Sequence, residues 1–492
     1  MKVQKMMKKL SVCIILFYVV SHFCLGRQNN GPVDKGIWKA AYDLYKEQSI
    51  THRRFKHKDI LPLIEKRQFG DVYRVTKLGS SIEARDIYQL GYGQGDIKVL
   101  LWSQMHGNES TATMALFDLF NFLEAGDDEF ESIRQTIREK LDLRFIPMVN
   151  PDGAEAFIRR NALDIDLNRD AIQLTSPESV ILRKAREDFG PDFGFNLHDQ
   201  QIYYNVERTP KPATISVLAP AFNYETEIND VRRRALQVIV GMNGLLQEII
   251  PGHVGKYDDG FEPRAFGDNF QRWGTSAILI ESGGYPGDPE KQYIRELNFI
   301  IILNALYEIA QASYTQYEVA DYFAIPDNDS KLMDVMLRNV TIKRDDLEYM
   351  VDLGIRRREI EGEEGYYTES SIIDIGDLSV YYGYDEIDAE GYVMKEGKVY
   401  EKELNALPSY EETMDMLKKG YLWLRVKTVN NSIHQLPINI FQSTGDLKAG
   451  AKLGSKANFL LEKEGMVHYA IINGYLIDLR SPKDQNIQLK IQ

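Results

Sequence analysis

Cysteine is nearly absent from this sequence. The chain of 492 residues contains only Cys13 and Cys24, and both lie in an N-terminal stretch that we expect to be removed. The remaining protein can then form no disulfide bond and no thiolate metal site, and a cysteine nucleophile is excluded. Any bound metal ion must therefore be held by histidine, aspartate or glutamate.

The N-terminal apolar run is also too short for an ordinary membrane span. It extends from Leu10 to Val20, whereas a transmembrane helix needs about 20 apolar residues. Four lysines precede the run and small or polar residues follow it, which is typical of a secretory signal. We predict a cleaved signal peptide at residues 1–26 and a secreted or periplasmic protein with no further membrane contact. An uncleaved anchor is the alternative.

An excess of positive charge is lacking as well. Removal of residues 1–26 would take away four lysines and no acidic residue, and would move the formal net charge from −14 to −18. A strongly acidic protein is repelled by nucleic acid and by anionic membrane surfaces. We therefore expect neither as a partner, and the sequence leaves the oligomeric state open.

Apolar strand-like runs alternate with amphipathic helical segments over residues 27–317. This alternation predicts an α/β domain with an open, mostly parallel or mixed sheet and helices on both faces. Asn108 or Ser110 can begin one helix, and Ser176 followed by Pro177 begins another. The expected strands are "IKVLLWSQM", "LDLRFIPMV", "DFGFNL" and "TSAILIE", and the main helices cover about 110–123, 176–189, 226–250 and 288–313.

The pattern changes beyond a linker at residues 318–328. Short β-type runs separated by turn residues predict a β-rich accessory domain over residues 329–492. Asn473-Gly474 between two apolar segments is typical of a type I′ hairpin. Ser409 and Glu412 form a capping box for one short helix that ends at Gly420.

Four potential metal-site residues lie where expected strands end. His106 and Glu109 follow the first strand, while His198 and Glu281 end two later ones. Side chains distant in sequence can converge in the crevice at the carboxyl ends of strands in an open α/β sheet. Two histidines and one glutamate, with a fourth position left for water, form a common catalytic zinc set.

These segments resemble the zinc carboxypeptidase family of metallopeptidases. The resemblance rests on "MHGNES", "NPDG", the arginines before "DLNRD", "NLHDQQ" and "AILIESGG", and it covers about residues 36–317. It implies that His106, Glu109 and His198 bind one Zn²⁺ per chain, and that Glu281 is the general base. By the same resemblance Asp166 orients His106, Arg159 polarises the scissile carbonyl with Arg160 as its rival, and Asn168 and Arg169 grip the terminal carboxylate of a peptide.

The implied function is that of a secreted zinc metallocarboxypeptidase. Such an enzyme hydrolyses C-terminal peptide bonds of substrates with a free C-terminus, through a zinc-bound water activated by Glu281. "HGNES" is closer to the aspartoacylase and succinylglutamate desuccinylase branch. A zinc-dependent amidase or deacylase acting on N-acyl amino acids or cell-wall peptides is therefore the alternative. A non-catalytic binding protein on the same scaffold is a third hypothesis.

Substrate selection is the least readable part of the sequence. The mobile tyrosine of many carboxypeptidases has no assigned counterpart among Tyr257, Phe261, Phe266 and Phe270, while Asp268 and Arg272 are candidates for a side-chain pocket. In the accessory domain, "LMDVMLRNVTI" and "GSKANFLLEKEGMVHYAIINGYLID" resemble two pieces of the small β-sandwich of metal-dependent amidohydrolases. That resemblance carries no catalytic residue.

Overall fold

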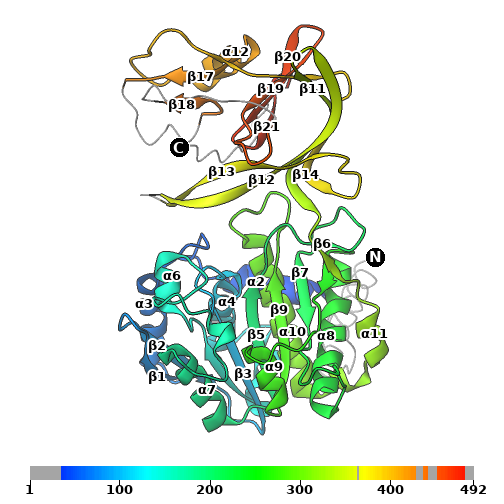
Figure 1. Cartoon of the computed structure of the whole chain (residues 1–492). Coiled ribbons are helices and arrows are strands. Elements are labelled where there is room, and N and C mark those ends of the chain that lie inside the picture. Colours follow the sequence, from blue (N-terminus) through cyan, green and yellow to red (C-terminus); the bar gives the residue numbers. More distant parts are fainter. Residues whose placement is uncertain (1–34, 363–364, 428–435, 442–451, 482–492) are drawn as a thin grey trace, which may run out of the picture.

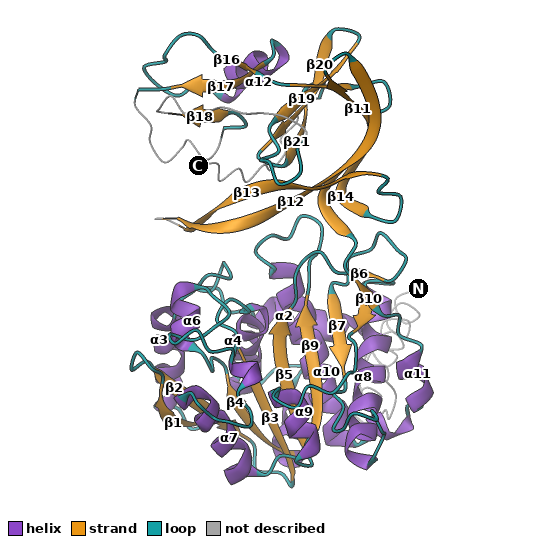
Figure 2. Ribbon diagram, viewed as in Figure 1, coloured by secondary structure: helices purple, strands orange, loops and turns teal. Residues whose placement is uncertain are grey.

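The computed structural model describes residues 35–362, 365–427, 436–441 and 452–481. The expected signal peptide, with both cysteines, lies outside these residues. The described part consists of a mixed α/β domain followed by a β-rich domain, as Figures 1 and 2 show. The predicted fold class is thus confirmed, while the domain boundaries stay predictions. No helix of the described residues has both the length and the apolar character needed to cross a membrane.

Eight strands form the central sheet of the first domain. They are β1 (Arg74–Ser80), β2 (Asp86–Tyr92), β3 (Ile97–Ser103), β4 (Leu141–Ile146), β5 (Phe193–Asp199), β7 (Ile215–Leu218), β8 (Val254–Lys256) and β9 (Ser276–Ser282). Their order is β1-β2-β4-β3-β5-β9-β7-β8. The central strands β4, β3, β5 and β9 are parallel, whereas β2 and β7 join them antiparallel. The sheet is therefore mixed, with a parallel centre.

The continuous apolar run in β3 reflects burial on both faces of this sheet. Val99 and Leu101 pack into one hydrophobic core, and Leu100 and Trp102 pack into the other. All four side chains are fully buried. Successive residues of a strand point to opposite faces, so a strand covered on both sides must be apolar throughout.

Helices cover both faces of the sheet. The larger core includes residues of α2 (Lys35–Tyr45), α3 (His57–Gln68), α4 (Thr111–Glu124), α5 (Glu131–Lys140), α8 (Asp230–Ile249), α10 (Gln292–Gln311) and α11 (Val319–Phe323). The opposite face is covered by α7 (Pro177–Phe189) and α9 (Phe266–Arg272). The short elements are α6 (Pro151–Ala156) and the 3₁₀ turns η1 (Leu167–Arg169) and η2 (Ser313–Gln316).

Helix α4 begins where the sequence predicted, but the side chain of Ser110 does not cap it. Ser110 precedes the helix, yet its side chain makes no cap hydrogen bond. Its Oγ instead donates to the backbone oxygen of Arg53 at 2.5 Å. The hydroxyl thus connects the start of α4 to a neighbouring segment rather than to the helix itself.

The segment predicted as a linker contains regular structure. It includes α11, and β10 (Asn328–Asp329) pairs antiparallel with β6 (Asn205–Val206) of the first domain. The chain therefore enters the second domain along a short two-stranded sheet.

A second eight-stranded sheet forms the centre of the β-rich domain. Its path is β13-β12-β11-β15-β19-β20-β21, with β14 beside β11. Two residues with positive φ, Asn473 and Gly474, join β20 to β21, as the predicted type I′ turn requires. The strands are β11 (Leu332–Arg344), β12 (Leu347–Gly362), β13 (Gly365–Gly376), β14 (Tyr382–Asp388), β15 (Val393–Lys395), β19 (Phe459–Lys463), β20 (Met466–Ile472) and β21 (Tyr475–Asp478).

A smaller sheet and one helix complete this domain. The sheet consists of β16 (Lys398–Val399), β17 (Tyr421–Arg425) and β18 (Asn439–Phe441), and α12 (Tyr410–Lys418) packs beside it. The predicted capping box of Ser409 and Glu412 begins α12. The two pieces with an amidohydrolase resemblance contribute strands to one sheet, and the resemblance itself stays a prediction.

Candidate metal centre

The four predicted site residues lie at the carboxyl ends of adjacent parallel strands. His106 and Glu109 lie between β3 and α4, His198 lies near the end of β5, and Glu281 lies near the end of β9. β5 pairs with both other strands, and His198 is directly opposite Glu281 in the register. The sheet itself therefore brings these distant parts of the sequence together.

Close backbone packing fixes the loop that carries His106. A Cβ atom on Gly107 would lie 1.9 Å from the backbone of Gly153, so this approach requires glycine. Asn150 caps α6 by accepting a hydrogen bond from the Gly153 backbone, and its Nδ2 donates to the backbone oxygen of Met105. The "NPDG" segment thus supports the loop next to the histidine.

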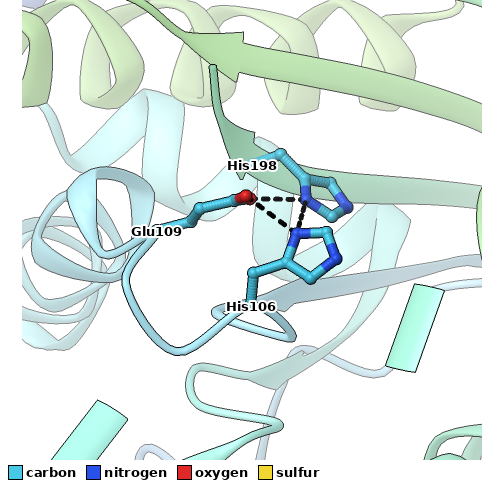
Figure 3. A group of neighbouring side chains, drawn as sticks. All are labelled: His106, Glu109 and His198. Atoms are coloured by element: carbon cyan, nitrogen blue, oxygen red, sulfur yellow. Dashed lines mark hydrogen bonds and ion pairs between the residues drawn. The ribbon is translucent and has the colours of Figure 1, made fainter. Parts of the chain in front are cut away.

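Three side chains converge on one point (Figure 3). Nδ1 of His106 lies 2.8 Å from Oε1 of Glu109, and Nδ1 of His198 lies 2.7 Å from Oε2 of the same carboxylate. The two Nδ1 atoms are 3.1 Å apart. All three residues are buried, and one ligand atom from each lies within 4.8 Å of the others. This donor set and spacing fit a single divalent cation such as zinc.

Asp166 fixes which nitrogen of His106 faces the centre. Its Oδ1 lies 3.1 Å from Nε2 of His106, opposite the nitrogen that faces Glu109. A proton on Nε2 donated to this carboxylate leaves the lone pair of Nδ1 for a metal ion. Asp166 therefore lies where a carboxylate that orients a metal-binding histidine is needed.

Arg159 lies at the centre, whereas Arg160 points away from it. Nη1 of Arg159 is 3.1 Å from Oε1 of Glu109, and its Nε is 3.0 Å from Oδ2 of Asp166. Its side chain remains 42% exposed. The guanidinium of Arg160 donates instead to the backbone oxygen of Asp164, and the residue is exposed.

Asn168 and Arg169 extend the site toward α9. The backbone N–H of Asn168 donates to Oδ1 of Asp166, and its side-chain oxygen accepts from the backbone N–H of Phe266. Arg169 lies 3.3 Å from Glu262 and keeps a partly exposed guanidinium. Asn168 is thus joined to the metal centre through Asp166, while Arg169 lies one step farther out.

The centre favours a charged carboxylate beside two imidazoles. Burial disfavours the charge of Glu109, but the adjacent His106 and His198 outweigh it and hold the pKa of Glu109 far below its usual range. Burial also opposes protonation of His106, yet Glu109 and Asp166 raise its pKa. Burial dominates at His198 and lowers its pKa. Burial thus favours the neutral form of His198, which is the form that binds a metal ion.

The pKa of Glu281 is shifted in the opposite direction from that of Glu109. Burial and then the negative charges of Glu109 and Asp199 raise the pKa of Glu281 well above its usual value. Arg159 and Lys291 act against this shift. A raised pKa makes the carboxylate of Glu281 a stronger base than an ordinary carboxylate.

Tyr257 is a site residue that the sequence did not assign. Burial and then the charge of Glu281 raise its pKa, and its ring packs 5.6 Å from that of Tyr204.

The other candidates for substrate selection lie elsewhere. Phe266 and Phe270 are fully buried in the core, and Phe261 packs against Tyr224. Burial raises the pKa of Asp268 to about 6, and its Oδ1 accepts from the backbone of Glu262. Arg272 is exposed.

The sequence analysis also did not identify the buried ion pair of Lys291 and Asp199 next to the candidate metal centre. Nζ of Lys291 donates to Oδ2 of Asp199 and to the backbone oxygen of Ser282, each at 2.9 Å. Asp199 directly follows His198, and Ser282 directly follows Glu281. The backbone N–H of Asp199 also donates to Glu109 at 3.1 Å. Lys291 therefore joins the segment of the candidate ligand His198 to the segment of the predicted base Glu281.

Comparison with known proteins agrees with this geometry. A family model described as zinc carboxypeptidase matches residues 64–202. An uncharacterized protein from Zymomonas mobilis is 30% identical over 128 residues, which cover 25% of this chain and 33% of that protein. Carboxypeptidase 2 from Trichophyton tonsurans is 28% identical over 143 residues, which cover 29% of this chain and 24% of that protein.

One solved structure is similar over a longer stretch. The metallo-carboxypeptidase from Burkholderia cenocepacia is 17% identical with a TM-score of 0.43, covering 53% of this chain and 70% of that chain. The matches to the two curated relatives above span only a quarter to a third of their length. The predicted resemblance is confirmed. Residues 64–202 match the model described as zinc carboxypeptidase.

Proposed function

We propose that this protein is an exported, zinc-dependent metallocarboxypeptidase that removes the C-terminal residue of peptides. The observation that carries the proposal is the convergence of His106, Glu109 and His198 within 4.8 Å at the strand ends that also carry Glu281. The relatives named carboxypeptidase support this substrate class. Export rests on the predicted signal peptide at residues 1–26.

A zinc ion held by His106, Glu109 and His198, one per chain, would supply Lewis acidity toward a water molecule and the substrate carbonyl. Glu281 takes a proton from the attacking water as its oxygen bonds to the carbonyl carbon. The same carboxyl group then gives this proton to the leaving amine nitrogen as the C–N bond breaks. Glu281 lies opposite the candidate ligand His198 in the sheet register, so the same carboxyl group can serve both steps.

Two arginines supply fixed positive charge for the same reaction. Arg159 is held beside the metal centre by Glu109 and Asp166, and its guanidinium would stabilise the negative charge that develops on the carbonyl oxygen. Asn168 and the partly exposed Arg169 bind the terminal carboxylate of the substrate, because a guanidinium pairs with a carboxylate through two hydrogen bonds. Arg160 has no role in this arrangement.

Matched peptides with free and amidated C-termini test the proposal. The purified protein is loaded with zinc, its metal content is measured, and hydrolysis of both peptides is followed by mass spectrometry. We expect one zinc per chain and cleavage of the free-acid peptide only. Equal cleavage of both peptides would contradict the role of Asn168 and Arg169 and would favour the amidase or deacylase alternative. Absence of hydrolysis of either peptide would contradict the proposed activity.

A further inference from the structure

The loop that leaves the end of β5 is bound to the β-rich domain. Residues 200–204 follow His198 and Asp199, and Oη of Tyr203 donates to Oδ2 of Asp334 on β11 at 2.6 Å. Oη of Tyr384 on β14 donates to the backbone oxygen of Ile202 at 2.5 Å. Asp334 also pairs with Arg357 of β12 at 2.8 Å. Three strands of the second domain thus hold the loop next to a metal ligand.

The loop that leaves the end of β9 is bound in the same way. Residues 283–291 follow Glu281, and Oε1 of Glu290 accepts a hydrogen bond from Oη of Tyr366 on β13 at 2.9 Å. A Cβ atom on Gly284 would lie 2.3 Å from Oη of Tyr384, so this tyrosine lies directly against the loop backbone. The β-rich domain therefore also borders the loop that follows the proposed base.

The third contact lies beside Glu109. The backbone oxygen of Arg53 accepts from Ser110, the residue after this ligand, and the guanidinium groups of Arg53 and Arg54 pair with Glu359 of β12. Arg54 also lies between two aromatic rings, 4.1 Å from the centre of Phe157 and 4.6 Å from that of Tyr366. Removal of one partner from a mostly buried charge cluster is costly, so these contacts fix the second domain in place.

The β-rich domain thus contacts the loops that follow β5 and β9, and it reaches the segment of Glu109 indirectly, through Arg53. Figure 1 shows β12, β13 and β14 on the side toward which the carboxyl ends of β5 and β9 point. The proposed carboxylate-binding residues lie on another side, because Asn168 and Arg169 contact Phe266 and Glu262 near α9. If the carboxylate of a peptide binds Asn168 and Arg169 and its last peptide bond lies at the metal centre, the preceding residues can reach the second domain.

We propose that the β-rich domain forms one wall of the substrate-binding surface and binds the peptide segment on the amino side of the cleaved bond. The proposal rests on the carboxypeptidase function proposed above. Tyr203, Tyr366 and Tyr384 are half-buried, and Arg53, Arg54 and Arg357 lie among them. Tyrosine and arginine bind extended peptides well, because they combine flat apolar surface with hydrogen-bond donors. The occupant is therefore an unstructured peptide several residues long.

Substrate length provides the test. We expect kcat/KM of the zinc-loaded full-length protein to rise from a blocked dipeptide to an octapeptide with the same last two residues, mainly through a lower KM. The expected gain is about tenfold, which corresponds to one or two good side-chain contacts. This measurement on the unchanged protein needs no variant and so does not depend on how any variant folds.

Two neighbouring tyrosines supply a variant and its matched control. Tyr366→Ala removes a ring that lies on the first domain, whereas Tyr367→Ala alters the next residue of the same strand, which points to the opposite face. We expect Tyr366→Ala to lower kcat/KM for the octapeptide about fivefold or more and to leave the dipeptide within about twofold. Tyr367→Ala should change neither value.

The outcomes separate the two proposals. If the dipeptide and octapeptide are hydrolysed with equal kcat/KM, or if Tyr366→Ala lowers both equally, the second domain is not part of the binding surface although the carboxypeptidase function stands. If the zinc-loaded protein hydrolyses neither peptide, the proposed function is wrong and the wall proposal is wrong with it.

Discussion

Two buried ion pairs of the first domain differ in how completely their polar atoms are bonded. Arg295 of α10 and Asp118 of α4 are both 0% exposed. All five N–H groups of Arg295 have acceptors, which are both oxygens of Asp118, the side chain of Gln292 and the backbone oxygens of Glu47 and Ile50. Nothing in this pair is left for a ligand.

The pair of Lys291 and Asp199 is less complete and lies at the metal centre. Both side chains are 7% exposed, but within the described part of the chain Oδ1 of Asp199 has no hydrogen-bond partner. The two pairs also differ in their neighbours, because Asp199 follows His198 in the sequence and Lys291 donates to the backbone of Ser282, which follows Glu281. The first pair therefore joins α4 to α10, whereas the second joins the segments of the candidate ligand His198 and the proposed base Glu281.

The largest effect is expected at the centre itself. Glu281→Gln removes the proposed base but keeps its shape, so kcat should fall by about 10²–10⁴-fold. The bound zinc and the unfolding temperature should not decrease, because this variant removes a buried carboxyl group. Steady-state kinetics, metal analysis and thermal unfolding measure the three quantities.

Glu187→Gln is the matched control for this change, since Glu187 is exposed on α7. It should leave kcat within about twofold, as most surface substitutions do. Full activity of Glu281→Gln would show that another group accepts the proton.

The next largest effect is expected in the free energy of unfolding, when the buried pair of Arg295 and Asp118 is broken. Arg295→Met leaves Asp118 buried without its partner and should lower the free energy of unfolding by about 3–5 kcal/mol, with little change in kcat of the molecules that remain folded. Lys184→Met removes an exposed pair with Asp188 on α7 and should lower it by less than about 0.5 kcal/mol. Denaturant unfolding measures both values, and equal losses would contradict a special role for the buried pair.

Lys291→Met should show that the Lys291–Asp199 pair affects kcat, whereas the Arg295–Asp118 pair affects stability. We expect kcat to fall about 10–100-fold, as with other groups that orient ligands, while KM stays within about twofold. The physical reason is that Lys291 joins Asp199 to the backbone of Ser282, beside His198 and Glu281. Arg295→Met, compared at a temperature where both variants are folded, should keep kcat. Equal loss of kcat in both variants would mean that Lys291 acts only through stability.

Sequence patterns were sufficient for the fold class of the first domain and for the four central strands β3, β4, β5 and β9, but not for β1, β2, β7 and β8. Strands covered on both faces must be apolar throughout, so runs such as Val99 to Trp102 were visible without any structure. The long hairpin of β12 and β13 was not, because its sequence around Arg356 to Glu359 is rich in charge. Glu359 pairs with Arg53 and Arg54 of the first domain, and Arg356 lies over the ring of Tyr203, whereas Arg358 pairs with Glu369 of the second domain. Contacts of this kind leave no periodic pattern.

The candidate site was predicted only where topology determines it. His106, Glu109, His198 and Glu281 could be grouped because each lies where a strand ends. Which of Arg159 and Arg160 points inward could not be derived, since the left-handed conformation of Phe157 sets the direction of that loop. Lys291 had no sequence signal either, because a single lysine in a turn resembles any exposed lysine.

The last expected effect is a pH dependence of stability that comes from the Arg295–Asp118 pair. Burial, opposed by the hydrogen bonds and charge of Arg295, raises the pKa of Asp118 to about 6 from an ordinary value of 3.8. Between these values the folded protein binds more protons at Asp118 than the unfolded chain does, so its contribution to stability falls as pH rises from about 4 to about 6. The slope is at most about 1.4 kcal/mol per pH unit, because one proton is involved.

Other carboxyl groups also titrate in this range, so the effect must be measured as a difference between wild type and Asp118→Asn, which cannot ionise at residue 118. Denaturant unfolding of both proteins from pH 4.5 to 6.5 should show the wild type losing stability relative to the variant as pH rises. A constant or rising difference would mean that Arg295 keeps Asp118 ionised throughout. The pair would then be held together by full charges at every pH in this range, and the two buried pairs would differ only in what lies next to them.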